Sequence, residues 1–148
     1  MDLFALPGAA SKAAPLVRIE FPGLPRGKGR PRSRIASTAT GRAFVHVYTD
    51  AKTVQYEKAL AWQAKAAMRG RAPLAGPLAV RVFAMMPIPA SWPRRDREAA
   101  LAGTKFHMTT PDSDNLAKSI DALNGIVWLD DDQIVCLMVL KEYGADPG

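Results

Sequence analysis

The sequence predicts a single small α/β domain, of the α+β type, in which helices pack on a mixed sheet. Its 148 residues suffice for one domain, and 48% of them are hydrophobic, so the chain can bury a core. Segments with the alternating pattern of strands are interspersed with segments of helical period. This composition excludes disorder over the whole length.

The first third of the chain is expected to contain two strands joined by a long loop. Residues 1–15 are mostly Ala, Gly, Pro and Ser, which predicts a disordered leader before a domain over residues 16–148. Residues 17–21 alternate apolar and charged side chains, which is typical of a half-buried strand. Repeated glycine and proline then predict a loop over residues 26–41. Strand character returns at residues 44–49.

A long helix and a strand are expected next. Asp50 can cap a helix over residues 50–69, and Gly70 can end it. The predicted buried face of this helix is Tyr56, Leu60, Ala64 and Ala67. Residues 78–86 predict a strand, because apolar side chains recur at every second position. The members of that face are Val80, Val82, Ala84 and Met86.

Two further helices follow in the sequence. Ser91 can cap a short charged helix over residues 92–102, which Gly103 would end. Another helix is expected over residues 113–123, before an Asn-Gly stop. Its predicted buried stripe is Leu116, Ile120 and Leu123.

The last predicted element is a largely buried strand over residues 133–143. It contains the longest unbroken apolar run, seven residues, and the single cysteine, Cys136, lies in that run and is expected to be a buried, inert thiol. One cysteine excludes an intrachain disulfide scaffold. The apolar run is too short to span a membrane, and the N-terminus lacks the features of a signal peptide. We therefore expect a cytoplasmic protein with no membrane partner.

The charges divide the chain into two opposed parts. Residues 1–110 carry 18 basic and 6 acidic side chains, whereas residues 111–148 carry 2 basic and 8 acidic ones. A basic surface indicates a polyanionic partner, and crowded carboxylates require a cation or a basic neighbour. The combination points to nucleic acid and metal ions.

The acidic part has informative spacing. Asp112 and Asp114 would point the same way if the helix begins only at Asp114. Lys118 lies four residues beyond Asp114 and therefore on the same helix face. A segment returning past this helix could add Asp130 or Asp131. Three carboxylate ligands with positions left for water and phosphate oxygens would suit Mg²⁺ or Mn²⁺.

Such a site would suit phosphodiester hydrolysis, because the metal activates water and neutralises developing charge, to which Lys118 could add. The alternative is that these acids are solvated turn and cap residues. The second acidic group at residues 130–132 argues against that alternative. An EF-hand is excluded, since Leu116 occupies its third ligand position.

The basic loop is the second candidate site. Glycine, proline and serine separate its five cations, so an extended loop would present them on one side at intervals of about 6.6 Å. Such a row suits a phosphate backbone, although a flexible loop that binds polyanions loosely is an equal alternative. The five predicted DNA-binding residues are Arg26, Lys28, Arg30, Arg32 and Arg34.

The remaining candidates favour structural roles. His46 and His107 lie far apart and have no nearby metal-ligating partner in the sequence. Trp62 and Trp128 are expected in the core. Trp92 could stack on a base, but we expect it to anchor the short helix.

Several segments of the chain resemble the signature of the RusA family of Holliday junction resolvases. The three central ones are residues 111–118 (PDSDNLAK), 121–125 (DALNG) and 130–134 (DDDQI). The resemblance extends upstream to the segments GLP at residues 23–25, TD at 49–50 and PIPASWP at 87–93.

This resemblance implies a RusA-like fold, a homodimer and metal-dependent cutting of four-way DNA junctions. It implies that Asp112, Asp114 and Asp131 are catalytic acids and that Lys118 is the catalytic lysine. Asp130 corresponds to the first acid of the paired motif and is expected to assist at the metal.

The sequence thus predicts a metal-dependent, structure-specific DNA endonuclease that resolves Holliday junctions by paired phosphodiester hydrolysis in DNA recombination and repair. One alternative is a non-catalytic protein that binds branched DNA. Another is a metal-dependent nuclease that acts on RNA or flaps.

Overall fold

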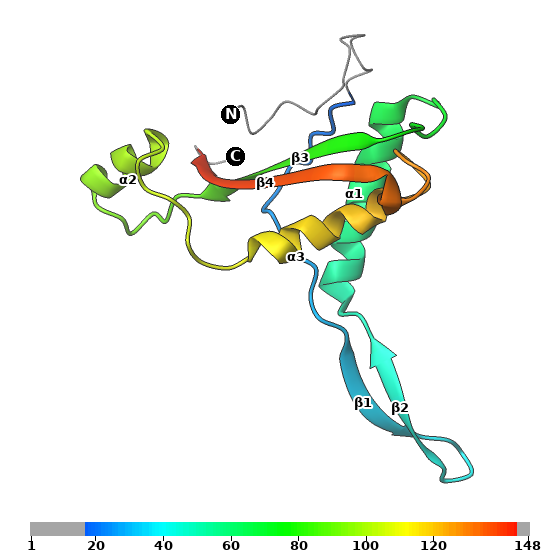
Figure 1. The fold of residues 1–148 in the computed structure, drawn as a ribbon. Coiled ribbons are helices and arrows are strands. Elements are labelled where there is room, and N and C mark those ends of the chain that lie inside the picture. Colours follow the sequence, from blue (N-terminus) through cyan, green and yellow to red (C-terminus); the bar gives the residue numbers. More distant parts are fainter. Residues whose placement is uncertain (1–16, 145–148) are drawn as a thin grey trace.

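Two parallel strands form the centre of the fold in the computed structural model of the chain, which describes residues 17–144 (Figure 1). β3 (Leu78–Pro87) pairs along its length with β4 (Ile134–Gly144). Alternate residues of β3 face the core, as predicted, and Ala84 and Met86 are buried there. Parallel pairing needs a long crossover, and residues 88–133 supply it.

Helices cover the inner face of this strand pair. α3 (Ser113–Lys118) continues into a 3₁₀ turn, η1 (Ser119–Leu123), so the predicted helix is present but tightens at its end. The predicted stripe of Leu116, Ile120 and Leu123 is buried. α1 (Ala51–Met68) packs against η1 and adds Ala64 and Met68 to the main core.

The helix termini follow from local chemistry. Asp50 caps α1 as predicted, and its carboxylate accepts the backbone N–H groups of Lys52 and Thr53, both at 3.1 Å. α2 (Arg94–Leu101) begins two residues later than predicted, because Pro93 and not Ser91 occupies the cap position.

The described residues form two separate two-stranded sheets, so the prediction of one mixed sheet is wrong. β1 (Arg32–Ser37) and β2 (Ala43–Tyr48) form an antiparallel hairpin. Residues 32–37, in the middle of the predicted 26–41 loop, therefore form a strand. Figure 1 shows this hairpin projecting away from the helices and from β3–β4.

The predicted strand over residues 17–21 is not formed. Its side chains do alternate, since Val17 and Ile19 pack on the core and Phe21 meets the Tyr56 ring edge-on at 5.0 Å. Its backbone does not pair with any strand of the two sheets in the described region. The predicted leader over residues 1–15 lies outside the described residues.

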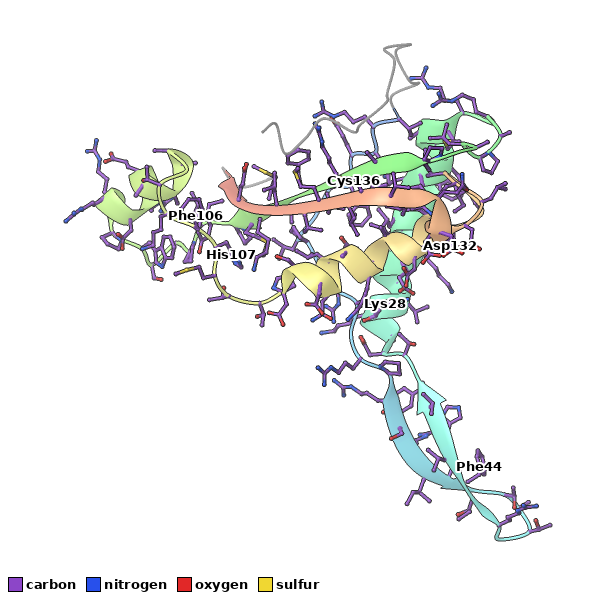
Figure 2. All side chains as sticks on the ribbon, in the orientation of Figure 1. Lys28, Phe44, Phe106, His107, Asp132 and Cys136 are labelled. Carbon is purple, nitrogen blue, oxygen red and sulfur yellow. The ribbon has the colours of Figure 1, made fainter. Side chains whose placement is uncertain are left out.

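Three burial predictions are wrong, and the first two fail because helices cover only one face of β3–β4. β4 is less buried than predicted, and Cys136 is an exposed thiol on the outer face (Figure 2). Trp62 points away from the core and is 73% exposed, whereas Trp128 is buried as predicted. Among the described helices, none has the length and apolar character that crossing a membrane requires.

Candidate active site and nucleic-acid interface

Three consecutive carboxylates form a cluster immediately before β4. Asp130, Asp131 and Asp132 each offer an oxygen within 4.8 Å of the others, and all three side chains are exposed. The 3₁₀ turn η2 (Asp131–Gln133) produces this proximity, because Asp130 caps it and accepts the backbone N–H of Asp132 at 3.1 Å.

Two neighbouring carboxylates of this cluster have pKa values shifted in opposite directions. The pKa of Asp131 is raised, first by its side-chain contact with Asp130, then by a small loss of hydration and by the charge of the Asp130 carboxylate. The pKa of Asp130 is lowered, mainly because its carboxylate accepts the backbone N–H of Asp132. Hard oxygen ligands crowded in this way fit a divalent cation such as Mg²⁺ or Mn²⁺.

Gln133 fixes this turn to the rest of the fold. Its side-chain oxygen accepts the backbone N–H groups of Leu129 and Asp130, at 2.8 and 3.2 Å. Its amide nitrogen donates to the carbonyls of Leu74 and Gly76, both at 3.0 Å. Gln133 therefore sets where the three carboxylates stand relative to the connection before β3.

The other predicted acids stand at the beginning of α3. Asp112 occupies the cap position with an exposed side chain, and Asp114 forms an ion pair of 3.1 Å with Lys118, one turn later, as predicted. The hydrogen bond from Lys118 lowers the pKa of Asp114. Neither Asp112 nor Asp114 belongs to the cluster of Asp130, Asp131 and Asp132.

A lysine that sequence reasoning missed holds the segment before Asp112. Lys141 of β4 donates to the carbonyl of Thr109 at 2.9 Å and to that of Pro111 at 3.1 Å. It pairs in register with buried Ala84, so it lies on the inner face of the sheet. A lysine within an apolar strand pattern is the signal that could have identified it.

The basic loop lies directly against α3. The backbone N–H of Lys28 donates to the carbonyl of Asn115 at 2.8 Å. Gly27 is required there, because an added Cβ would come within 2.7 Å of the Asn115 Cβ. The loop and the start of α3 together line a pocket that contains Arg26, Lys28, Arg30, Pro111, Asp112 and Asn115.

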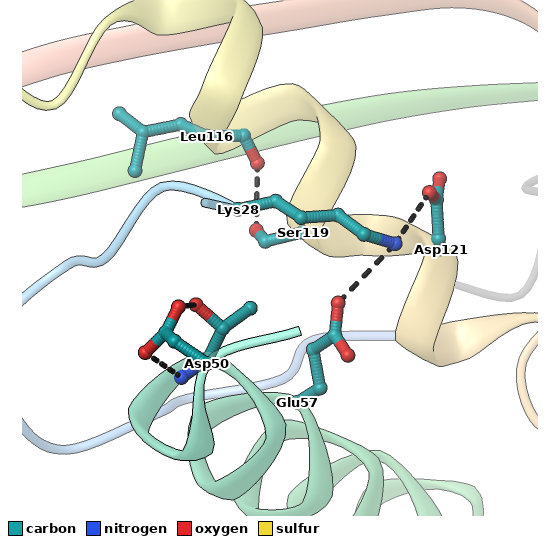
Figure 3. Close-up of polar contacts among 7 residues, drawn as sticks. Lys28, Asp50, Glu57, Leu116, Ser119 and Asp121 are labelled. Carbon is teal, nitrogen blue, oxygen red and sulfur yellow. Dashed lines mark hydrogen bonds and ion pairs between the residues drawn. The ribbon is translucent and has the colours of Figure 1, made fainter. Parts of the chain in front are cut away.

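Two cations of this loop face carboxylates of the body. The Lys28 ammonium lies between Asp121, at 3.1 Å, and Glu57, at 3.3 Å (Figure 3). Burial alone would lower the pKa of Lys28, but the hydrogen bonds and charges of Asp121 and Glu57 outweigh it and raise that pKa. Arg26 lies 3.6 Å from Asp50.

The other three cations point elsewhere. Within residues 17–144, Arg30, Arg32 and Arg34 form no ion pair with a carboxylate. Arg32 and Arg34 belong to β1, two residues apart, and therefore share one face of the hairpin. The five predicted DNA-binding residues thus divide into two that anchor the loop and three that remain available.

Trp92 and His107, the remaining candidates, both pack against Tyr143 and therefore have structural roles. Trp92 packs edge-on against Tyr143 at 5.2 Å and carries the Lys105 ammonium over its ring, which agrees with an anchoring role. His107 packs against the same tyrosine at 5.2 Å. Burial, together with the charge of Lys141, lowers the pKa of His107, which favours its neutral form.

Comparison with known proteins agrees with these observations. A family model described as "Endodeoxyribonuclease RusA" matches residues 22–148. A Bacillus subtilis (strain 168) protein described as "Uncharacterized protein YqaN" is 34% identical over 128 residues, which cover 84% of this chain and 86% of that protein. No solved structure matches the chain. Since the family match spans nearly the whole chain and contains both the acidic segments and the basic loop, the chain belongs to the RusA family of endodeoxyribonucleases.

Proposed function

We propose that this protein is a divalent-metal-dependent, structure-specific endonuclease that resolves four-way DNA junctions as a homodimer, in DNA recombination and repair. One observation carries this proposal: Asp112 shares a pocket with Arg26, Lys28 and Arg30. A phosphate attracted by these cations would lie beside a carboxylate that can hold a metal ion.

The proposed metal ligands are Asp112, Asp114, Asp130 and Asp131, of which Asp130 and Asp131 already lie within the carboxylate cluster. When bound, Mg²⁺ or Mn²⁺ would supply an activated water and offset the charge that develops on the phosphate. Lys118 would contribute positive charge beside Asp114, to which it lies within 3.1 Å. We assign the catalytic roles to Asp112, Asp114, Asp131 and Lys118.

The basic loop supplies affinity for the DNA backbone. Arg30, Arg32 and Arg34 would contact phosphates, because no carboxylate of the described region competes for them. Arg26 and Lys28 would contribute charge to the same surface while their ion pairs hold the loop beside Asp112.

Paired cutting would require two active sites, which a homodimer would supply. A four-way junction presents two symmetry-related strands, and a two-fold dimer places one active site at each of them.

Junction cleavage by the purified protein tests the proposal. We expect Mg²⁺-dependent cutting by the wild type and a rate lower by about a hundredfold or more for Asp114→Asn and for Asp131→Asn. Asp96→Asn is the matched control, since Asp96 lies on α2, belongs to neither acidic segment and pairs with Lys105, so this variant should cut at the wild-type rate.

The same assay separates the alternatives. Equal cutting by the wild type and Asp114→Asn would remove the proposed metal site. Salt-sensitive junction binding without metal-dependent cutting would indicate a non-catalytic branched-DNA-binding protein. Preferential cutting of RNA or of flaps in a substrate panel would indicate a different nuclease.

A further inference from the structure

The β1–β2 hairpin has two chemically different faces. In its register Arg32 lies opposite Tyr48, Arg34 opposite His46 and Ala36 opposite Phe44, so these side chains share one face. We call this the cationic–aromatic face: Arg32, Arg34, Phe44, His46 and Tyr48. The opposite, aliphatic face carries Ile35, Val45 and Val47.

The rings of the cationic–aromatic face lie close together and are accessible. The His46 and Tyr48 rings are nearly parallel, at 20°, with centroids 5.9 Å apart, and the Arg34 guanidinium lies over the Tyr48 ring at 5.9 Å. Phe44 lies opposite a small residue, Ala36, and is 46% exposed. Planar groups therefore line this face, and the Phe44, His46 and Tyr48 side chains are all exposed to solvent.

Internal stability does not account for these residues. The two strands pair only with each other and project away from the helices and from β3–β4 (Figure 1). Figure 2 shows Phe44 on this projecting hairpin. A two-stranded hairpin with no covering layer is marginal by itself, and exposed aromatic side chains contribute little to its folding. The exposed rings are therefore better explained by a partner that covers them.

The charge of the hairpin identifies the class of partner. Residues 31–49 contain three arginines and no acidic residue. Cations bind phosphates, while exposed rings and guanidinium planes stack on bases, and their combination is typical of surfaces that bind unpaired nucleic acid. An acidic protein would satisfy the arginines but would leave the stacked rings without a function.

The position of the hairpin relates it to the proposed active site. β1 begins two residues after Arg30, which lines the pocket of Asp112. Six residues of strand extend about 20 Å, so Phe44 would lie roughly that far along the DNA from the pocket. The branch point of a junction is where base stacking is interrupted and where bases can meet exposed rings.

We propose that the cationic–aromatic face of the hairpin binds DNA at the branch point, with Phe44 and Tyr48 stacking on exposed bases. This inference rests on the proposed function, since it assigns the part of the substrate that meets this surface. Selection of branched DNA over duplex DNA would then depend on the hairpin and not on the acidic cluster.

Affinity measurements on both faces of the hairpin test this proposal. Phe44→Ala and Tyr48→Ala are titrated in metal-free buffer against a four-way junction, an oligothymidine single strand and a duplex. We expect about tenfold weaker binding to the junction and to the single strand, with little change for the duplex. Val45→Ala is the matched control, because Val45 is adjacent in sequence, lies on the aliphatic face and is 65% exposed.

Three results would overturn the inference: unchanged affinity of both aromatic variants, equal losses for Val45→Ala and Phe44→Ala, or equal losses on duplex and branched DNA. Binding of an acidic protein in place of DNA would also contradict it. The single strand tests the stacking face even if the wild type cuts no junction, a result that would overturn the proposed function alone. Normal cutting by the wild type with unchanged affinity of the variants would overturn the hairpin inference alone.

Discussion

At the scale of single residues, Gln133 is the side chain on which the acidic turn depends. Replacing it by leucine keeps the bulk but removes four hydrogen bonds to Leu74, Gly76, Leu129 and Asp130. We expect Gln133→Leu to lower the free energy of unfolding by about 2 kcal/mol, because these bonds are partly solvent-exposed. Urea unfolding measures this loss, and a Mn²⁺ titration should show weaker binding.

The same substitution at an exposed position provides the control. Gln55 lies on α1 and is exposed, so Gln55→Leu should change neither unfolding nor Mn²⁺ binding. Unaltered Mn²⁺ binding by Gln133→Leu would show that the acidic turn does not need this anchor.

Residue roles could be predicted from sequence only where partners are near in the chain. The spacing of Asp114 and Lys118 is a fixed property of a helix turn, and their ion pair is present. Lys28 meets Asp121 across 93 positions, a contact for which no local pattern exists. The convergence of Asp112 and Asp114 with Asp130 and Asp131 stays a prediction, because it concerns two separate segments.

At the scale of elements, the basic loop and α3 must approach closely, and Gly27 permits that approach. A methyl group in Gly27→Ala would meet Asn115 and Pro111, at 2.7 and 3.2 Å. We expect the loop to move away from α3, at a cost of about 1–3 kcal/mol. Displacement of the cations from Asp112 should lower the junction-cleavage rate about tenfold or more, which a single-turnover assay measures.

A stability-matched variant separates the two effects of Gly27→Ala. Gly70 has a φ of +75° with open space around its Cα, so Gly70→Ala is strained by about 1–2 kcal/mol without touching the loop. Its cleavage rate should stay at the wild-type value. A comparable loss of cleavage in both variants would mean that stability, and not loop position, limits the rate.

Elements with one buried face could be predicted, and elements without one could not. β3, α1 and α3 each show a periodic apolar pattern, and each lies within a few residues of its predicted position. β1 is exposed along nearly its whole length, so its sequence has no buried period, and only hydrogen bonding to β2 makes it a strand. Residues 17–21 show the opposite case. Their side chains alternate between core and solvent, but their backbone pairs with no strand in the described region, so they do not form a strand.

At the scale of the whole molecule, the outer face of β3–β4 bears on the proposed homodimer. Phe83 and Leu140 pair at its centre and are 59% and 38% exposed. Arg81 and Glu142 lie toward opposite ends of the same face. A two-fold axis that lies in the interface and runs across the strands near this pair would bring Arg81 of one copy close to Glu142 of the other, and the inner face with α3 would stay open in each copy.

We therefore expect Phe83→Glu to convert a dimer into a monomer, because it places two carboxylates at the centre of an apolar contact. Light scattering after size-exclusion chromatography measures the mass, and the monomer should nick single strands of a junction without paired cutting. Since Phe83 is exposed in the single chain, the monomer should stay folded, and its thermal unfolding should fall only by the contribution that association makes to the dimer. Leu101→Glu is the control, because Leu101 is 58% exposed on α2, outside this face, and should remain dimeric. A dimer of unchanged mass for Phe83→Glu would exclude this face as the interface, and the symmetry argument for paired cutting would then require another contact surface.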